Sequence, residues 1–67
     1  MIQLDARGYS CPEPVLQLKK VIDGHREIDL LVDNQTSAKV CGRFAESKSF
    51  TVHTRREGRD YVLELRK

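Results

Sequence analysis

Hydrophobic and polar residues alternate in four short segments of the chain and follow a helical period in two longer ones. The alternating segments, residues 2–5, 28–33, 49–54 and 60–66, are predicted strands. The helical period, in which apolar residues recur every three or four positions, covers residues 12–22 and about 34–47. The sequence therefore predicts the element order β-α-β-α-β-β.

Each predicted strand has one apolar face, and the helices should pack against that face. By alternation, the inward residues are Ile2, Leu4, Ile28, Leu30, Val32, Phe50, Val52, Tyr61, Leu63 and Leu65. Right-handed crossovers between successive strands place both helices on the same side. We therefore expect an α+β fold: a two-layer α/β sandwich with a mixed four-stranded sheet and both helices on one face. The opposite face should be open and carries Gln3, Leu31, Thr51, His53, Val62 and Glu64.

The length of 67 residues fits one small domain, so residues 1–67 are treated as a single unit. A net charge of +2 is too small to indicate nucleic-acid binding, and the open sheet face lacks an aromatic pair on which bases could stack. Nothing resembles a signal peptide or a membrane span. We expect a cytoplasmic protein without direct contact to nucleic acid or membrane. No motif for a cofactor or a metal is present.

The chemistry of the sequence is concentrated in residues 10–14, where an extended segment turns into the first helix. Pro12 favours extended dihedrals at Cys11 and suits the first helical position. The thiol is then expected over the helix N-terminus, whose partial positive charge favours the thiolate. Against this, Pro12 and Pro14 remove two of the free amides there, and the carboxylate of Glu13 opposes a nearby anion. From these residues alone, a reactive Cys11 and an incidental core cysteine are equally open.

The remaining candidate residues lie on the predicted helices. Cys41 falls inside the apolar arc of the second helix and is interpreted as a core thiol. Because it is thirty positions from Cys11, the two cysteines form neither a disulfide framework nor a CxxC motif. Leu16 lies outside the arc of the first helix, beside Lys19 and Lys20. Although an isolated surface leucine is ordinary, this group next to a candidate nucleophile predicts a docking surface for a partner protein.

Residues 4–8 and 11–15 together resemble the signature of the TusA/SirA family of sulfur-carrier proteins, L-D-x-x-G-x-x-C-P-x-P, at every fixed position. The length and the element order agree with that family over the whole chain. Residues 33–34 and 43–47 look closer to the N-terminal domain of YedF-type proteins, which are associated with sulfur or selenium metabolism. Asn34 stands where the branch that thiolates transfer RNA usually has a proline.

The resemblance implies a domain that accepts sulfane sulfur as a persulfide on Cys11 and relays it to a partner cysteine. The donor would be a cysteine desulfurase or a rhodanese-like protein, and a downstream protein would accept the sulfur. Such a protein is a sulfurtransferase-type carrier rather than a stand-alone catalyst. The motif positions that would support the cysteine are Asp5, Gly8, Pro12, Glu13 and Pro14.

Two other functions fit the same sequence. A non-catalytic interaction module that regulates a partner through Leu16, Lys19 and Lys20 would tolerate the loss of Cys11. A selenium-handling domain of the YedF type would need Cys11. The residues do not identify the donor, the acceptor or the pathway.

Overall fold

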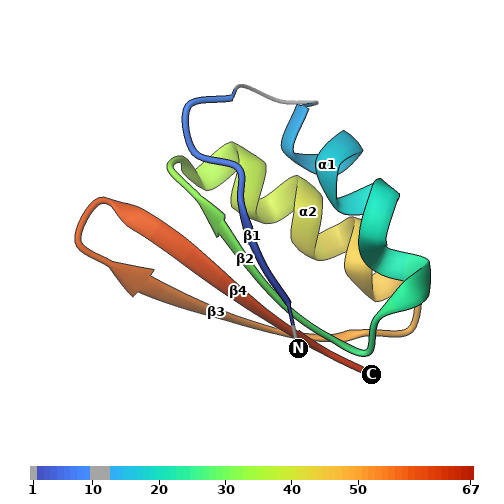
Figure 1. The fold of residues 1–67 in the computed structure, drawn as a ribbon. Helices are drawn as coiled ribbons and strands as arrows, with labels where there is room; N and C mark the ends of the chain where they lie inside the picture. Colours follow the sequence, from blue (N-terminus) through green and yellow to red (C-terminus); the bar gives the residue numbers. More distant parts are fainter. Residues whose placement is uncertain (1, 10–12) are drawn as a thin grey trace.

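The computed structural model describes residues 2–9 and 13–67. The elements in chain order are β1 (Ile2–Asp5), α1 (Glu13–Val21), the short 3-10 helix η1 (Ile22–Gly24), β2 (Glu27–Val32), α2 (Gln35–Ser47), β3 (Thr51–Glu57) and β4 (Asp60–Arg66). Figure 1 follows them from the N-terminus to the C-terminus. The predicted order β-α-β-α-β-β is confirmed.

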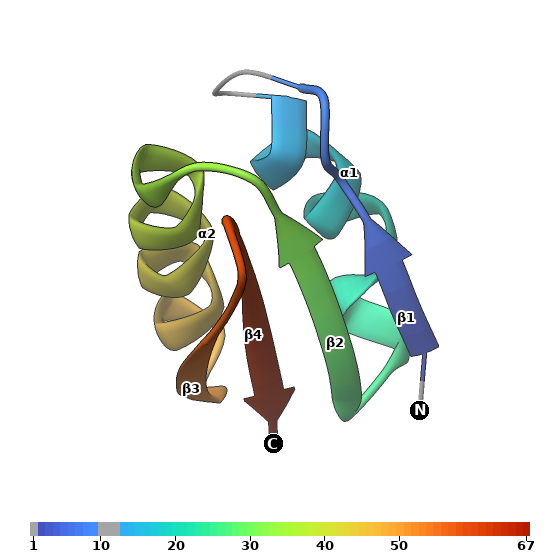
Figure 2. The same ribbon diagram turned by 90° about the vertical axis from the view of Figure 1, so that its left-hand side faces the viewer.

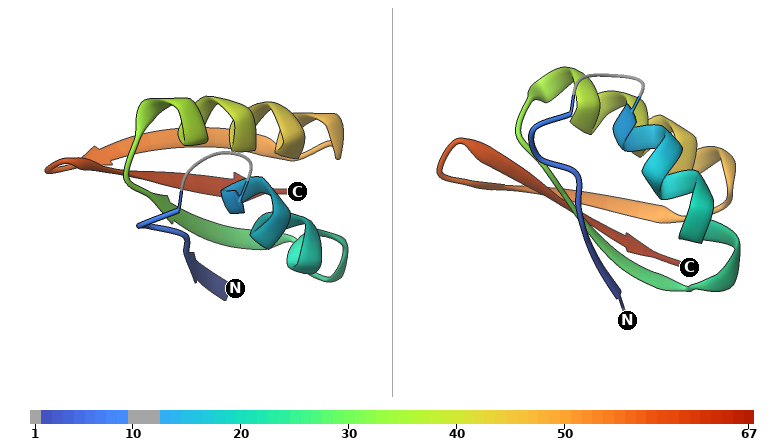
Figure 3. Two further views of the ribbon diagram at one scale, coloured as in Figure 1. Left: turned by 90° about the horizontal axis from the view of Figure 1, so that it is seen from above. Right: turned by 45° about the horizontal axis from the view of Figure 1, so that its top comes forward.

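The strands form one mixed sheet in the order β1-β2-β4-β3. β1 and β2 run parallel and are joined through α1, whereas β2 pairs with β4, and β4 with β3, in antiparallel fashion. Both helices cover the same face of this sheet (Figure 1, Figure 3). The predicted two-layer α/β sandwich is therefore confirmed, and the other face of the sheet is open.

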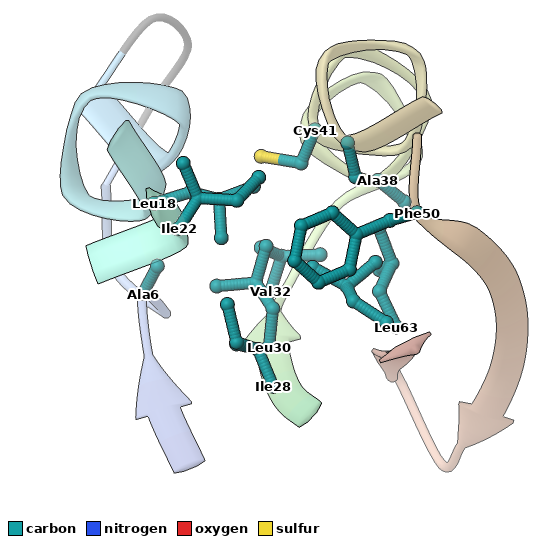
Figure 4. Packing of buried hydrophobic residues seen from close by; sticks show 12 residues of the cluster. Ala6, Leu18, Ile22, Ile28, Leu30, Val32, Ala38, Cys41, Phe50 and Leu63 are labelled. Carbon is teal, nitrogen blue, oxygen red and sulfur yellow. The ribbon is translucent and has the colours of Figure 1, made fainter. Parts of the chain in front are cut away.

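The hydrophobic core fills the space between the sheet and the two helices (Figure 4). The inward faces predicted for the central strands are confirmed, because Ile28, Leu30, Val32, Leu63 and Leu65 have no exposed surface. Ile2, Leu4, Val52 and Tyr61 are partly buried and pack against this core. The helices contribute Leu18, Ile22, Ala38, Cys41 and Ala45. Burial of these apolar side chains is the main favourable term in the folding of so small a domain.

The helix ends show where local chemistry modifies the periodic pattern. The first helix was expected to run through residue 22, but Ile22 begins η1, a tighter turn that still buries its side chain. At the start of α2, Asn34 is extended, with φ −151° and ψ 156°. Its side-chain oxygen accepts a hydrogen bond of 2.7 Å from the backbone N–H of Ser37, so Asn34 caps α2.

The third strand begins and ends later than predicted. Ser49 has a φ of 70°, a left-handed conformation that ends the chain reversal after α2 and is incompatible with a strand. Phe50 therefore precedes β3, although it is buried as expected. At the other end, the two-residue turn starts at Gly58, whose φ is 61°. Arg55 and Arg56 consequently belong to β3, which pairs with β4 up to the turn.

Candidate functional site

Cys11 and its neighbours Ser10 and Pro12 lie outside the described residues. The expected acidic thiol at the start of α1 therefore stays a prediction. The structure does describe the chain on both sides, up to Tyr9 after β1 and from Glu13 at the start of α1. These flanking residues define the surroundings of the motif.

The flanks of the motif lie at one end of the two-layer sandwich, which we call the site end. It comprises residues 5–9, 13–14, 33–34 and 60. Because β1 and β2 are parallel, their carboxyl ends and the N-termini of α1 and α2 meet there (Figure 2). The antiparallel strand β4 begins at the same end, since Tyr61 is paired with Val32. Residues distant in the sequence are thereby brought together.

Asp33 connects the loop after β1 to the end of β2. Its Oδ2 atom accepts a hydrogen bond of 2.8 Å from the N–H of Gly8, and its Oδ1 atom accepts one of 3.1 Å from the side-chain amide of Asn34. These two bonds hold the pKa of Asp33 below its ordinary value, and the bond from Gly8 has the larger effect. Gly8 has a φ of 85°, a conformation that strongly favours glycine. At neutral pH the loop is thus bonded to a carboxylate anion.

Arg7 forms a second connection, between β1 and the start of β4. Its guanidinium contacts Asp5 at 3.0 Å and Asp60 at 3.3 Å. The backbone N–H of Arg7 also donates to Asp5 Oδ1 at 3.1 Å. The side-chain hydrogen bond from Arg7 lowers the pKa of Asp5, and the carboxylate of Asp5, followed by that of Asp60, raises the pKa of Arg7. The loop between β1 and the motif is therefore bonded to the rest of the domain by Arg7 and Gly8, through side chains of other segments, in addition to the backbone hydrogen bond that Ala6 donates to Leu31.

At the start of α1, the motif residues differ in their surroundings. Pro14 is fully buried, which the sequence did not predict. Glu13 is half-buried, and its Oε1 atom accepts a hydrogen bond of 3.1 Å from Gln17, one turn along the helix. The burial of Pro14 attaches the first turn of α1 to the domain. The roles assigned to Glu13 and Pro14 by the family resemblance stay predictions.

The three residues predicted to dock a partner are all exposed on α1. The side chain of Leu16 is 43% exposed. Lys19 reaches toward α2, where its Nζ atom lies 5.9 Å from the ring centroid of Phe44, and Lys48 approaches the same ring at 5.9 Å. The exposed surface of α1 is therefore apolar at Leu16 and basic beside it, but its use for docking stays a prediction.

Sequence reasoning missed several residues of the site end. Asp33 and Asp60 sit at strand boundaries, and their contacts to Gly8 and Arg7 depend on the strand order. Tyr9, next to the motif, is 47% exposed. One feature of the sequence could have indicated Asp33, because it directly follows a buried strand. The residue after a parallel strand lies beside the loop that follows the neighbouring parallel strand.

The described residues also bear on metal binding and on membrane insertion. Within residues 2–9 and 13–67, no three His, Cys, Asp or Glu side chains gather as a metal site would require. In this part of the chain, no helix is both long and apolar enough to span a membrane.

The fold and the site end describe a small two-layer α/β domain whose motif lies in the sequence between β1 and α1. The family model described as Sulfurtransferase TusA matches residues 2–67, and the chain therefore belongs to the TusA family. A similar solved structure is the crystal structure of the SirA-like protein from Desulfitobacterium hafniense. It is 27% identical, with a TM-score of 0.87, and the alignment covers 98% of this chain and 96% of that chain. No match was found among curated proteins. Family membership supports a general role in sulfur transfer.

Proposed function

We propose that this chain is a sulfur carrier that accepts sulfane sulfur as a persulfide on Cys11 and relays it to a partner protein. The chain has two cysteines. The observation that carries the proposal is that Cys41 has no exposed surface, so its sulfur is not accessible to another protein. Figure 4 shows this sulfur pointing from α2 toward Leu18 and Ile22. In a member of a sulfurtransferase family, this favours Cys11 of the motif as the carrier.

The proposed chemistry consists of two thiol exchanges. In loading, the Cys11 thiolate attacks the terminal sulfur of a donor persulfide, the donor sulfur–sulfur bond breaks, and the donor leaves as a thiolate. In discharge, an acceptor thiolate attacks the outer sulfur of the Cys11 persulfide, and Cys11 leaves as a thiolate. Each step conserves atoms and electrons. Because a full cycle needs both a donor and an acceptor, the chain acts as a carrier between enzymes rather than as a catalyst alone.

The partners are proposed by their chemistry. A cysteine desulfurase or a rhodanese-like protein presents a persulfide and would load Cys11, and a protein thiol would receive the sulfur. A reducing cytoplasm would keep Cys11 available as a thiol. The surface formed by Leu16, Lys19 and Lys20 would contact an acidic patch on such a partner, because it places two cations beside an exposed apolar side chain.

Loading is tested by incubating the chain with a cysteine desulfurase and cysteine and measuring its intact mass without reductant. We expect the wild-type chain and Cys41→Ala to gain one sulfur atom, and Cys11→Ser to gain none. Normal loading of Cys11→Ser would contradict the proposal. Loss of loading in a folded Cys41→Ala protein would show that the two cysteines act together.

The docking surface is tested by reversing charges. Lys19→Glu with Lys20→Glu should slow loading by roughly tenfold at low salt, because steering by complementary charges commonly changes association rates by that factor or more. Lys39→Glu with Arg43→Glu is the matched control. It changes the net charge equally, but on the side of α2 that adjoins Val52 and Thr54 of β3. Equal loading rates for the two double variants would refute docking through α1. A small alkylating agent should react equally with both.

A further inference from the structure

We infer that Asp33 is a positioning residue for sulfur transfer, because its carboxylate holds the segment that leads from β1 to Cys11 through the N–H of Gly8. This inference rests on the proposed function of Cys11. It assigns to Asp33, which lies twenty-five positions from Gly8, a part in presenting the thiol to another protein.

The carboxylate of Asp33 is well placed to hold a loop, because its own backbone is fixed. Asp33 directly follows Val32, which is fully buried in the central strand β2. Its Oδ1 atom accepts the hydrogen bond from Asn34, whose side chain also caps α2. Asp33 therefore lies between the buried end of β2 and the cap of α2, and these neighbours place its Oδ2 atom as an acceptor for the loop.

The loop itself has little packing at the point that Asp33 contacts. Up to Ala6 it is attached by the sheet, since Ala6 is buried and donates to the carbonyl of Leu31 at 2.8 Å. Two residues later this changes. A Cβ atom built on Gly8 would meet nothing within 4 Å, so Gly8 is not wedged between neighbouring groups. Its 2.8 Å bond to a charged acceptor is a directional contact of the stronger class of hydrogen bond.

Chain connectivity carries this restraint to Cys11. Cys11 is three positions after Gly8 and two before Glu13, where α1 starts. Three residues of chain span at most about 11 Å, so the position of Gly8 limits where the thiol can go. Transfer between two proteins requires the attacking thiolate and the donor persulfide to be aligned, whereas a small reagent can approach from many directions. Loss of the restraint should therefore slow loading by a protein far more than alkylation.

The test compares Asp33→Ala and Asp33→Asn with the wild-type chain and with Ile28→Val, a core variant of reduced stability in the amino-terminal half of β2. Three quantities are measured on folded protein: hydrogen exchange of the Gly8 amide, the loading rate with a cysteine desulfurase, and the pH profile of alkylation by iodoacetamide. Asp33→Ala should lose the protection of the Gly8 amide. It should also load about tenfold more slowly, since one or more freed residues must be ordered in the complex. Alkylation at the plateau of the pH profile should change by less than about twofold, because that reaction does not need the aligned loop.

Asp33→Asn keeps a side-chain oxygen and should recover part of both the protection and the loading rate. Ile28→Val should load at the wild-type rate, because it lowers stability without touching the loop. If Asp33→Ala slowed loading only by lowering stability, Ile28→Val would slow it as well. The inference is overturned if Asp33→Ala loads normally while the wild-type chain also loads. It is likewise overturned if Ile28→Val slows loading as much as Asp33→Ala. If the wild-type chain gains no sulfur at all, the proposed function fails first, and the positioning role fails with it.

Discussion

The core and the site end of this domain are held together by different kinds of contact. In the core, the side chains that join helices to sheet are apolar and hidden, as at Leu18 and Leu63, which have no exposed surface. At the site end, Ala6 and Pro14 are buried, but the side-chain contacts of Arg7 and Asp33 that hold the loop after β1 are ion pairs and hydrogen bonds between exposed groups. Arg7 and Asp5, for example, have side chains that are 48% and 56% exposed.

Because of this difference, the core should determine the stability of the domain, and the site end should determine the position of the loop that leads to Cys11. A fully buried leucine contributes about 1.5–3 kcal/mol, whereas an exposed ion pair contributes about 0–1 kcal/mol. The polar contacts of the site end therefore add little to the free energy of unfolding. Because hydrogen bonds are directional, they can still determine the path of the loop that leads to Cys11. Variants of the two regions should accordingly differ in which measurement they change.

The largest effect on stability is expected from a core residue on α1. Leu18→Ala should lower the free energy of unfolding by about 2–5 kcal/mol, the usual range for a buried leucine. Leu16→Ala, two positions earlier on the same helix, removes a half-exposed side chain and should change it by less than about 0.5 kcal/mol. Urea denaturation followed by circular dichroism measures both. Similar values for the two variants would mean that α1 does not pack as described.

A smaller loss of stability is expected at the buried cysteine. Cys41→Ala deletes one sulfur atom from the core and should lower the free energy of unfolding by about 1 kcal/mol. Loading with sulfur should be unchanged at a temperature where the variant is folded. If Cys41→Ala had normal stability but no longer gained sulfur, Cys41 would take part in sulfur transfer rather than in core packing.

At the start of α2, two neighbouring substitutions should have opposite signs. Ser37 is 1% exposed, and its hydroxyl oxygen has no hydrogen-bond partner in the part of the chain that the structure describes. Ser37→Ala should therefore raise the free energy of unfolding by about 0.5 kcal/mol. Asn34→Ala removes the helix cap and should lower it by about 1 kcal/mol. Destabilisation by Ser37→Ala would show that the hydroxyl has a bonding partner such as a buried water.

The smallest effect concerns the pH dependence of the loop contact. The pKa of Asp33 is lowered in the folded state, so its contribution is fully present above the ordinary pKa and is lost as the pH falls through the lower, folded-state value. The amide shift of Gly8, followed by NMR, should be constant at neutral pH and change only in acid, at a pH below the ordinary pKa of an aspartate. Asp33→Asn should abolish this titration. A Gly8 shift that titrates near neutral pH would contradict the assignment of Asp33 as its acceptor.

The sequence predicted the core well because burial leaves a periodic signal. Strand alternation identified Leu30 and Leu63 as inward, and the helical period identified Cys41 as buried and Leu16 as exposed; all four are confirmed. Positions of this kind depend only on near neighbours in the chain. Asn34 as a helix cap is an equally local feature, because its acceptor and donor are three residues apart.

The contacts of the site end could not be predicted in the same way. The bond between Gly8 and Asp33 joins residues twenty-five positions apart and depends on the parallel register that pairs Asp5 with Leu31. The ion pair between Arg7 and Asp60 spans fifty-three positions and depends on β4 lying next to β2. Since a shift of one residue turns every side chain to the other face, such contacts require the assembled sheet. Sequence reasoning therefore found the motif with Gly8, but not the contacts that Asp33 and Asp60 make with the loop.

The central claim is that Cys11, and not Cys41, carries labile sulfur. Trypsin cleaves after lysine and arginine, which places Cys11 in the peptide 8–19 and Cys41 in the peptide 40–43. We predict that, after loading and removal of the donor, one added sulfur atom is found on peptide 8–19. Treatment with cyanide should remove it and release an equal amount of thiocyanate. Added sulfur on peptide 40–43, or sulfur on peptide 8–19 that cyanide does not remove, would contradict the account.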